Sequence, residues 1–218
     1  MKNNQSTHQY SPREEKINII SHAFGLILSC GATAVLVTAA ALYGTVWHIV
    51  SFSLFGASLI VLYAASTCYH TATSRERRHR LKIFDHAAIY VLIAGTYTPF
   101  TLVTLNGTIG WILFGVTWGI ALIGVTLKLF YTGRYDIIST LMYILMGWVI
   151  VFAIKPLLSN FPFPGFLWLL SGGIAYTLGA ILYSIKQIKF NHALFHFLVL
   201  VGSFCHFISV FFYVLPRH

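Results

Sequence analysis

Ionisable and hydroxyl side chains recur at helical spacings in a chain that is otherwise strongly apolar. His192 and His196 stand four residues apart, so on a helix they share one face. Ser66 and His70 have the same spacing. Two imidazoles on one helix face are a common way to hold a metal ion, and neutral imidazole suits zinc. Since a catalytic zinc takes three protein ligands and a water, His70, His192 and His196 form a candidate set of Zn²⁺ ligands.

Three polar residues near the start of the chain also share one helix face. Glu15, Asn18 and His22 are spaced i, i+3 and i+7. We expect them to support the metal ligands through hydrogen bonds, as the outer neighbours of metal ligands do. Two alternatives remain open at this stage. His22 is also a candidate fourth ligand, and Glu15 could instead stabilise the N-terminus of its helix through the helix dipole.

Asp85 and Ser66 are the candidate catalytic residues. The two histidines stand in the sequence His192-Ala193-Leu194-Phe195-His196, which lacks the adjacent Glu that acts as base in soluble zinc proteases. Any base must therefore come from another helix, and Asp85 is the available carboxylate. It is a candidate to orient or deprotonate a water, or to accept a hydrogen bond from a ligand. Ser66 would help to hold an oxyanion or the water, or it simply bonds the carbonyl one turn back.

The elements that carry these residues must be membrane-spanning helices. Hydrophobic residues make up 57% of the chain and charged residues 9%, whereas a soluble domain carries about 25% charged residues. Seven apolar stretches have the length of roughly 20 residues that a spanning helix needs. They cover residues 17–43, 47–70, 83–105, 108–130, 137–155, 164–186 and 192–215. The sequence thus predicts an all-α, polytopic membrane protein in which segment 1–16 precedes one seven-helix transmembrane domain, 17–215.

The positions of Lys and Arg predict the orientation. With the N-terminus inside, all but two of the 14 Lys and Arg residues lie on the inner side, the exceptions being Lys155 and Arg217. Because cytoplasmic loops are enriched in Lys and Arg, we expect a cytoplasmic N-terminus and a C-terminus outside. The candidate site residues then lie at helix ends near the cytoplasmic boundary. Ionisable groups at membrane depth are costly, so this gathering indicates a functional site.

The net charge of +9 has a plain explanation in the same topology. The cluster Arg75-Glu76-Arg77-Arg78-His79-Arg80 is the strongest argument for nucleic-acid binding. A cytoplasmic loop that obeys the positive-inside rule and meets anionic lipid headgroups is the preferred explanation. We therefore expect membrane lipids and no nucleic acid as partners, while the oligomeric state stays unknown.

The spaced polar residues resemble the three motifs of a known family. Glu15-x-x-Asn18-x-x-x-His22, Ser66-x-x-x-His70 with Asp85, and His192-x-x-x-His196 are similar to motifs of the progestin and adipoQ receptor family. Within that family the chain most resembles the bacterial haemolysin III branch, over residues 13 to 213. The resemblance implies a seven-helix bundle with zinc near its cytoplasmic face, ligands at His70, His192 and His196, and Asp85 beside the water. It also implies kinship with alkaline ceramidases, which are zinc-dependent lipid amide hydrolases.

Three functions are compatible with these expectations. The first is a zinc-dependent hydrolase of a lipid amide or ester, in the multi-pass setting of a bacterial plasma (inner) membrane, where the resemblance implies a role in membrane homeostasis. The second is a pore-forming haemolysin or cytolysin, although no span carries a strongly charged stripe. The third is a sensor or receptor of membrane state with a structural zinc, which would favour four protein ligands over three.

Overall fold

A computed structural model describes residues 10–132 and 136–216 of the chain. Residues 1–9 of the expected N-terminal segment lie outside the described residues. So do Arg134 and Arg217, which are two of the basic residues counted in the orientation argument.

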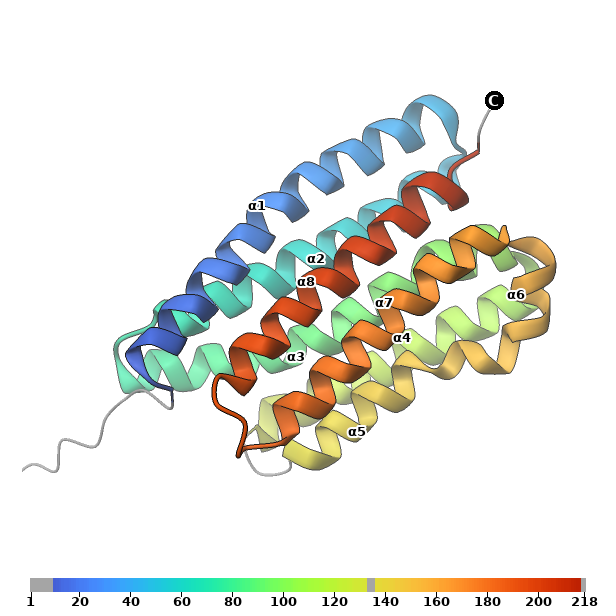
Figure 1. The fold of residues 1–218 in the computed structure, drawn as a ribbon. Helices are drawn as coiled ribbons and strands as arrows, with labels where there is room; N and C mark the ends of the chain where they lie inside the picture. Colours follow the sequence, from blue (N-terminus) through green and yellow to red (C-terminus); the bar gives the residue numbers. More distant parts are fainter. Residues whose placement is uncertain (1–9, 133–135, 217–218) are drawn as a thin grey trace, which may run out of the picture.

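Within the described residues, seven helices are long and apolar enough to cross a membrane, which confirms the predicted all-α, seven-span architecture. Successive spans run antiparallel along one bundle (Figure 1). The α-helices are α1 (Pro12–Tyr43), α2 (Val46–Thr71), α3 (Arg75–Pro99), α4 (Gly107–Tyr131), α5 (Asp136–Gly147), α6 (Ile154–Asn160), α7 (Phe163–Ser184) and α8 (Asn191–Ser209). Short π-helical segments, Phe100–Leu105 and Val210–Val214, extend α3 and α8. A 3₁₀ segment, Val149–Ala153, joins α5 to α6 within the fifth span.

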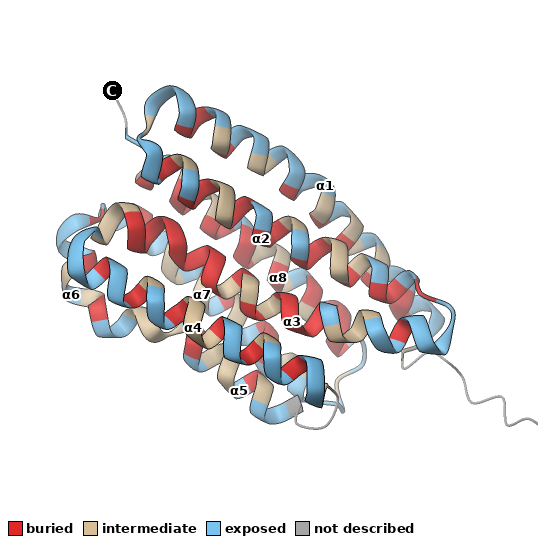
Figure 2. Cartoon of the chain, turned by 180° about the vertical axis from the view of Figure 1, so that it is seen from behind, coloured by how far each residue is buried: buried red, intermediate tan, exposed pale blue. Residues whose placement is uncertain are grey.

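The third span is the central helix of the bundle. In the apolar stretch of this span 72% of the residues are buried, whereas the share is 22% in the corresponding stretches of the first and fifth spans. Figure 2 shows the buried residues on the faces that the helices turn toward one another. Around α3 the core packs large side chains such as Phe52, Phe55, Leu59 and Phe100. A polar residue on α3 is therefore held in the interior unless it lies at the end of the helix.

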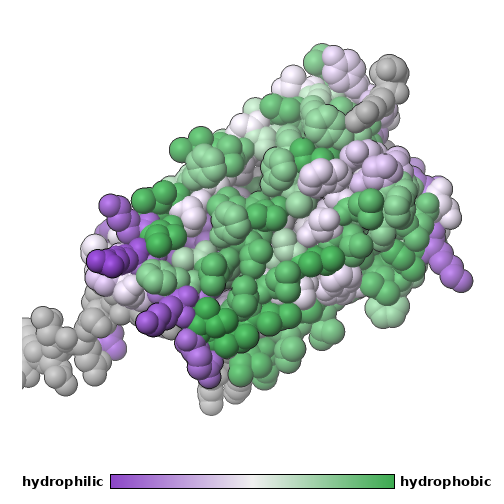
Figure 3. All heavy atoms as spheres, viewed as in Figure 1, coloured by the Kyte–Doolittle hydropathy of each residue, from purple (hydrophilic) through white to green (hydrophobic). Residues whose placement is uncertain are grey.

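The outer surface is apolar along the spans and polar at their ends. Ile27, Leu122 and Phe152 are among the large hydrophobic residues with most of their surface exposed. In Figure 3 such apolar side chains cover the flank of the bundle, and the hydrophilic ones gather toward its two ends. This pattern is the one that a lipid environment requires, because the lipid tails replace water as solvent for the flank.

Two helices, α1 and α3, begin five or more residues before the predicted starts at 17 and 83. α1 begins at Pro12 rather than at 17, because Ser11 caps it by accepting a hydrogen bond from the Glu14 N–H at 3.3 Å. α3 begins at Arg75 rather than at 83, so the basic cluster is the first part of a helix and not a loop. Arg and Glu are good helix formers, and the exposed pair Arg80–Glu76 joins successive turns at 2.6 Å.

The fifth span is interrupted, which the single predicted helix 137–155 did not anticipate. A regular helix cannot run through this region because Pro156 lacks an N–H and its ring clashes with the carbonyl four residues earlier. Tyr97 of α3 bridges the interruption. Its hydroxyl donates to the Gly147 carbonyl at 2.7 Å and accepts from the Ile150 N–H at 2.9 Å. The backbone groups that the break releases are thus satisfied inside the bundle, as membrane depth requires.

Candidate metal centre

The predicted site residues meet at the end of the bundle where α1, α3 and α8 begin and α2 ends (Figure 1). α2 ends at Thr71, so His70 lies in its last turn. His192 and His196 lie in the first turns of α8, which begins at Asn191. The antiparallel topology therefore brings residues that are far apart in sequence to one depth.

His70, His192 and His196 form a compact and buried cluster. One ligand atom from each lies within 4.8 Å of those of the other two. Nε2 of His70 and Nε2 of His192 are 3.0 Å apart. The three residues are exposed over 1%, 3% and 1% of their surface, in that order. Three buried imidazoles with converging nitrogen atoms are a donor set that can bind a metal ion.

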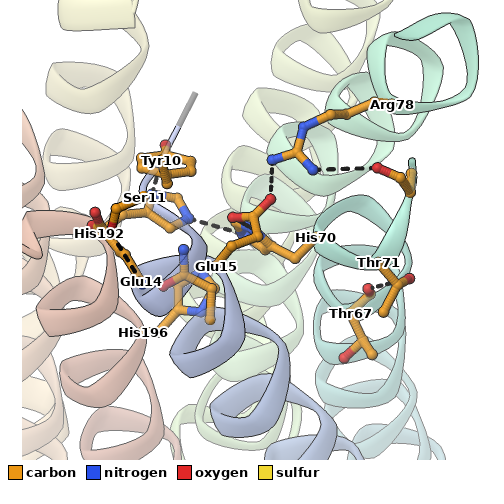
Figure 4. Close-up of polar contacts among 12 residues, drawn as sticks. Tyr10, Ser11, Glu14, Glu15, Thr67, His70, Thr71, Arg78, His192 and His196 are labelled. Atoms are coloured by element: carbon orange, nitrogen blue, oxygen red, sulfur yellow. Dashed lines mark hydrogen bonds and ion pairs between the residues drawn. The ribbon is translucent and has the colours of Figure 1, made fainter. Parts of the chain in front are cut away.

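Each of these imidazoles has its other ring nitrogen, Nδ1, next to a side chain from residues 10–21. Figure 4 shows the partners of His70 and His192, which are Glu15 and Tyr10. The Nδ1–H of His70 donates to Oε2 of Glu15 at 3.0 Å. Nδ1 of His192 lies 3.1 Å from the hydroxyl of Tyr10, and Nδ1 of His196 lies 3.3 Å from that of Ser21. Such contacts orient the ring and choose the tautomer of a metal-ligating histidine. The start of α1 is thus the support of the whole cluster.

Arg78 holds Glu15 from the opposite side. Its guanidinium forms an ion pair with Oε1 of Glu15 and donates to the Ala72 carbonyl at 3.4 Å. Arg78 also lies over the ring of Tyr69, 4.7 Å from its centroid. Both members of the ion pair are buried. A buried carboxylate needs such compensation, and here the arginine keeps Glu15 ionised and aimed at His70.

The residues present fit a metal ion. With its Nδ1–H donating to Glu15, His70 has a lone pair on Nε2. When the Nδ1–H of His192 donates to Tyr10, the Nε2 of His192 also has a lone pair, and the two lone pairs face each other across 3.0 Å. Lone pairs at this distance repel unless a cation lies between them. The Glu15 carboxylate therefore fixes the metal-binding tautomer of His70, and the contact with the Tyr10 hydroxyl is compatible with that of His192.

Asp85 borders the same space from α3. It lines a cavity of about 120 Å³ together with His22, His192 and His196. Asp85 is buried, and its Oδ2 lies 3.1 Å from Nδ1 of the adjacent His86. The rest of the cavity wall is mostly apolar, with residues such as Leu92 and Val199. The structure thus brings the predicted carboxylate and two of the predicted ligands onto one cavity.

His22 and Asn18 also lie in the cluster but in a different way from Glu15. The ring of His22 stacks on that of His196, with centroids 3.5 Å apart and planes 8° from parallel. Among the described residues neither His22 nor Asn18 has a hydrogen-bond partner for its buried side chain. The same holds for the hydroxyl of Ser66, so the alternative in which Ser66 bonds the carbonyl one turn back does not apply in this structure.

Sequence reasoning missed four residues at this site. Tyr10 precedes the first helix, so helical spacing gave no signal for it. Ser21 is one residue from His22 and falls outside the i, i+3, i+7 pattern. Arg78 was grouped with the basic cluster, and His86 lies about 100° around the helix from Asp85 in an ideal helix. A search for a counter-charge to Glu15 would have pointed to the basic start of α3, and the structure identifies Arg78 as the member of that cluster that is buried.

The fold and the site define a class: a seven-span helical membrane protein with a buried three-histidine cluster at one end.

Comparison with known proteins gives the family. The family model for haemolysin-III-related proteins matches residues 10–207, and the chain belongs to this family. It is 45% identical over 204 residues to a protein named Hemolysin-3 homolog from Bacillus subtilis (strain 168), covering 94% of this chain and 96% of that protein. It is 46% identical over 204 residues to Hemolysin-3 from Bacillus cereus, covering 94% and 93%. Seven spans and bacterial relatives of nearly full length identify a multi-pass protein of the plasma membrane.

Proposed function

We propose that the protein is a zinc-dependent hydrolase that cleaves a lipid amide or ester and so contributes to membrane homeostasis. The observation that carries the proposal is the position of the histidine cluster at one end of an apolar cavity that Asp85 also lines. A lipid can place its reactive carbonyl at the polar end of such a cavity and its chain along the apolar wall. The family resemblance to ceramidases agrees with this arrangement.

His70, His192 and His196 would hold the metal through Nε2. Bound there, zinc supplies a Lewis acid that polarises a carbonyl and lowers the pKa of a water molecule. The chain itself supplies the rest. Glu15, with Arg78 behind it, keeps the ring of His70 in place.

Asp85 and Ser66 have the two proposed catalytic roles. The Asp85 carboxylate accepts a proton from the attacking water and returns it to the leaving group. Nδ1 of the neighbouring His86 lies 3.1 Å from this carboxylate. We assign to the Ser66 hydroxyl, which is buried and without a partner among the described residues, a hydrogen bond to the developing oxyanion or to the water.

Asp85→Asn tests the enzymatic role directly. The amide has nearly the same volume and still forms hydrogen bonds, but it cannot act as a base at neutral pH. We expect wild-type zinc content and a loss of lipid product by a factor of about 10²–10⁴. Mass spectrometry of lipids from membranes with and without the protein identifies the product. Normal product formation by Asp85→Asn would exclude this mechanism, and no product from the wild type would favour a structural zinc in a sensor.

The names of the two relatives favour a second candidate, a pore-forming haemolysin. Dye release from vesicles that contain the purified protein tests it. For a pore, leakage would persist in Asp85→Asn and in His192→Ala, because neither change would remove a conducting path. For the hydrolase, leakage requires turnover and would be lost in both variants.

A further inference from the structure

A second cavity lies beyond the first, on the side away from the histidine cluster. The first cavity has a volume of about 120 Å³ and the second about 130 Å³. The second is lined by apolar residues such as Phe100, Ile154 and Leu169. The residues that line both cavities are Thr96, Tyr97, Gly147, Trp148, Gly173 and His206. The two cavities are thus adjacent spaces with a common wall.

The common wall lies deep in the bundle. On α8, His206 follows His196 by ten residues, which is about 15 Å at about 1.5 Å per residue. A straight apolar chain that starts at the histidine cluster therefore reaches the wall after about 15 Å. The wall is a natural place to limit the length of a ligand.

Trp148 is the largest side chain of this wall, and its position follows from the interruption of the fifth span. It lies directly after the last residue of α5 and before the 3₁₀ segment, with a non-helical backbone. From there its indole N–H donates to Oγ1 of Thr177 on α7 at 3.0 Å. The adjoining Tyr97 hydroxyl holds the backbone on both sides of Trp148. The indole is thus fixed across two spans rather than free to rotate.

We propose that Trp148 separates the two cavities and sets the length of the acyl chain that the protein accepts. The inference rests on the proposed function, because it takes the first cavity to hold the acyl chain of the lipid. Removing the indole joins the two spaces, so additional methylene groups can enter the second cavity. Each buried methylene contributes favourably to binding, so longer chains gain most from the change.

The experiment measures the affinity of the purified protein for fatty acids, the acyl products of the proposed reaction. Unlabelled dodecanoate and stearate compete with radiolabelled dodecanoate for the protein in detergent, and the ratio of their affinities is compared between variants. Partition of the acids into micelles cancels in this comparison. In Trp148→Ala we expect the ratio to shift toward stearate by about tenfold or more, the size of the effect of one or a few methylene groups in a pocket.

Two further variants make the result specific. Thr177→Val removes the hydroxyl that accepts the hydrogen bond from the indole N–H, while the indole itself stays in place. We therefore expect a smaller shift of the affinity ratio toward stearate. Trp168→Ala is the matched control, because Trp168 is partly exposed, contacts Phe204 and lines neither cavity. Its ratio should equal that of the wild type.

An unchanged ratio in folded Trp148→Ala would overturn the inference. If that variant does not fold, an unchanged ratio in Thr177→Val would do so. A wild-type protein that binds neither acid would also overturn it. The variants could show the expected shifts in affinity while the wild-type protein releases no fatty acid from lipid. That result would contradict the proposed hydrolysis and support the assignment of Trp148.

Discussion

The hydroxyl of Tyr10 lies 3.1 Å from Nδ1 of His192, and the two rings stack with their centroids 4.6 Å apart. Tyr10 stands just before Ser11, the cap of α1. Burial raises the pKa of the Tyr10 phenol above its ordinary value, so the group remains a neutral hydroxyl. A residue outside the spans therefore orients a candidate metal ligand on the last helix, 182 positions away.

Tyr10→Phe should weaken metal binding while the fold is kept. The phenyl ring can still stack on His192, but the hydrogen bond that orients the imidazole is lost. Loss of such a partner typically lowers metal affinity by about 10–100-fold. Competition with a zinc chelator measures the change. Tyr43→Phe, at the far end of α1, is the control and should bind zinc like the wild type; equal affinities for all three proteins would refute a role for the hydroxyl.

Glu15→Gln should lower both stability and zinc retention. The change leaves Arg78 buried without its carboxylate and replaces the charged acceptor of the His70 Nδ1–H by a neutral amide, which accepts more weakly and can also turn its NH₂ group toward the ring. Breaking a buried ion pair from one side costs about 3–5 kcal/mol. Thermal unfolding of the purified protein and elemental analysis would record the two effects.

Glu76→Gln is the matched control for Glu15→Gln. Glu76 pairs with Arg80 on the exposed start of α3, where an ion pair contributes about 0–1 kcal/mol. We expect little change in the unfolding temperature and full zinc content. If both glutamate variants behave alike, the buried network does not support the metal centre.

Replacing the candidate ligands should remove the metal. His192→Ala eliminates one of three nitrogen ligands, and we expect most of the zinc to be lost from the purified protein. The double variant His70→Ala/His196→Ala should contain essentially none. Elemental analysis decides, and full zinc occupancy in the double variant would end the assignment of these residues.

The orientation of the bundle is open to a direct test. The excess of Lys and Arg at the end that carries the histidine cluster predicts that this end faces the cytoplasm. A reporter that is active only in the cytoplasm should be silent when fused after His218. The same reporter in the connection near Arg75 should be active. Activity after His218 would reverse the orientation and place the cluster on the outer side.

The sequence by itself determined the class of fold, the number of spans and the residue types of the site. Long apolar runs specify spanning helices because lipid leaves the backbone no other way to satisfy its polar groups. The i, i+4 pair His192 and His196 specified a shared face because helix geometry is local. The order and direction of the spans placed His70 at the depth of this pair, but only the packing of the ends of α2 and α8 brings Nε2 of His70 to 3.0 Å from Nε2 of His192.

Only the tertiary structure decided what surrounds the cluster. Tyr10, Ser21 and Arg78 act at the site through contacts with residues distant in sequence, and no spacing rule relates them. The interruption at Gly147 likewise depends on Tyr97 of another helix to satisfy the released backbone groups. Periodicity reports which face of a helix is buried. It does not report which neighbour buries that face, because partner choice is settled by packing and hydrogen bonding between helices.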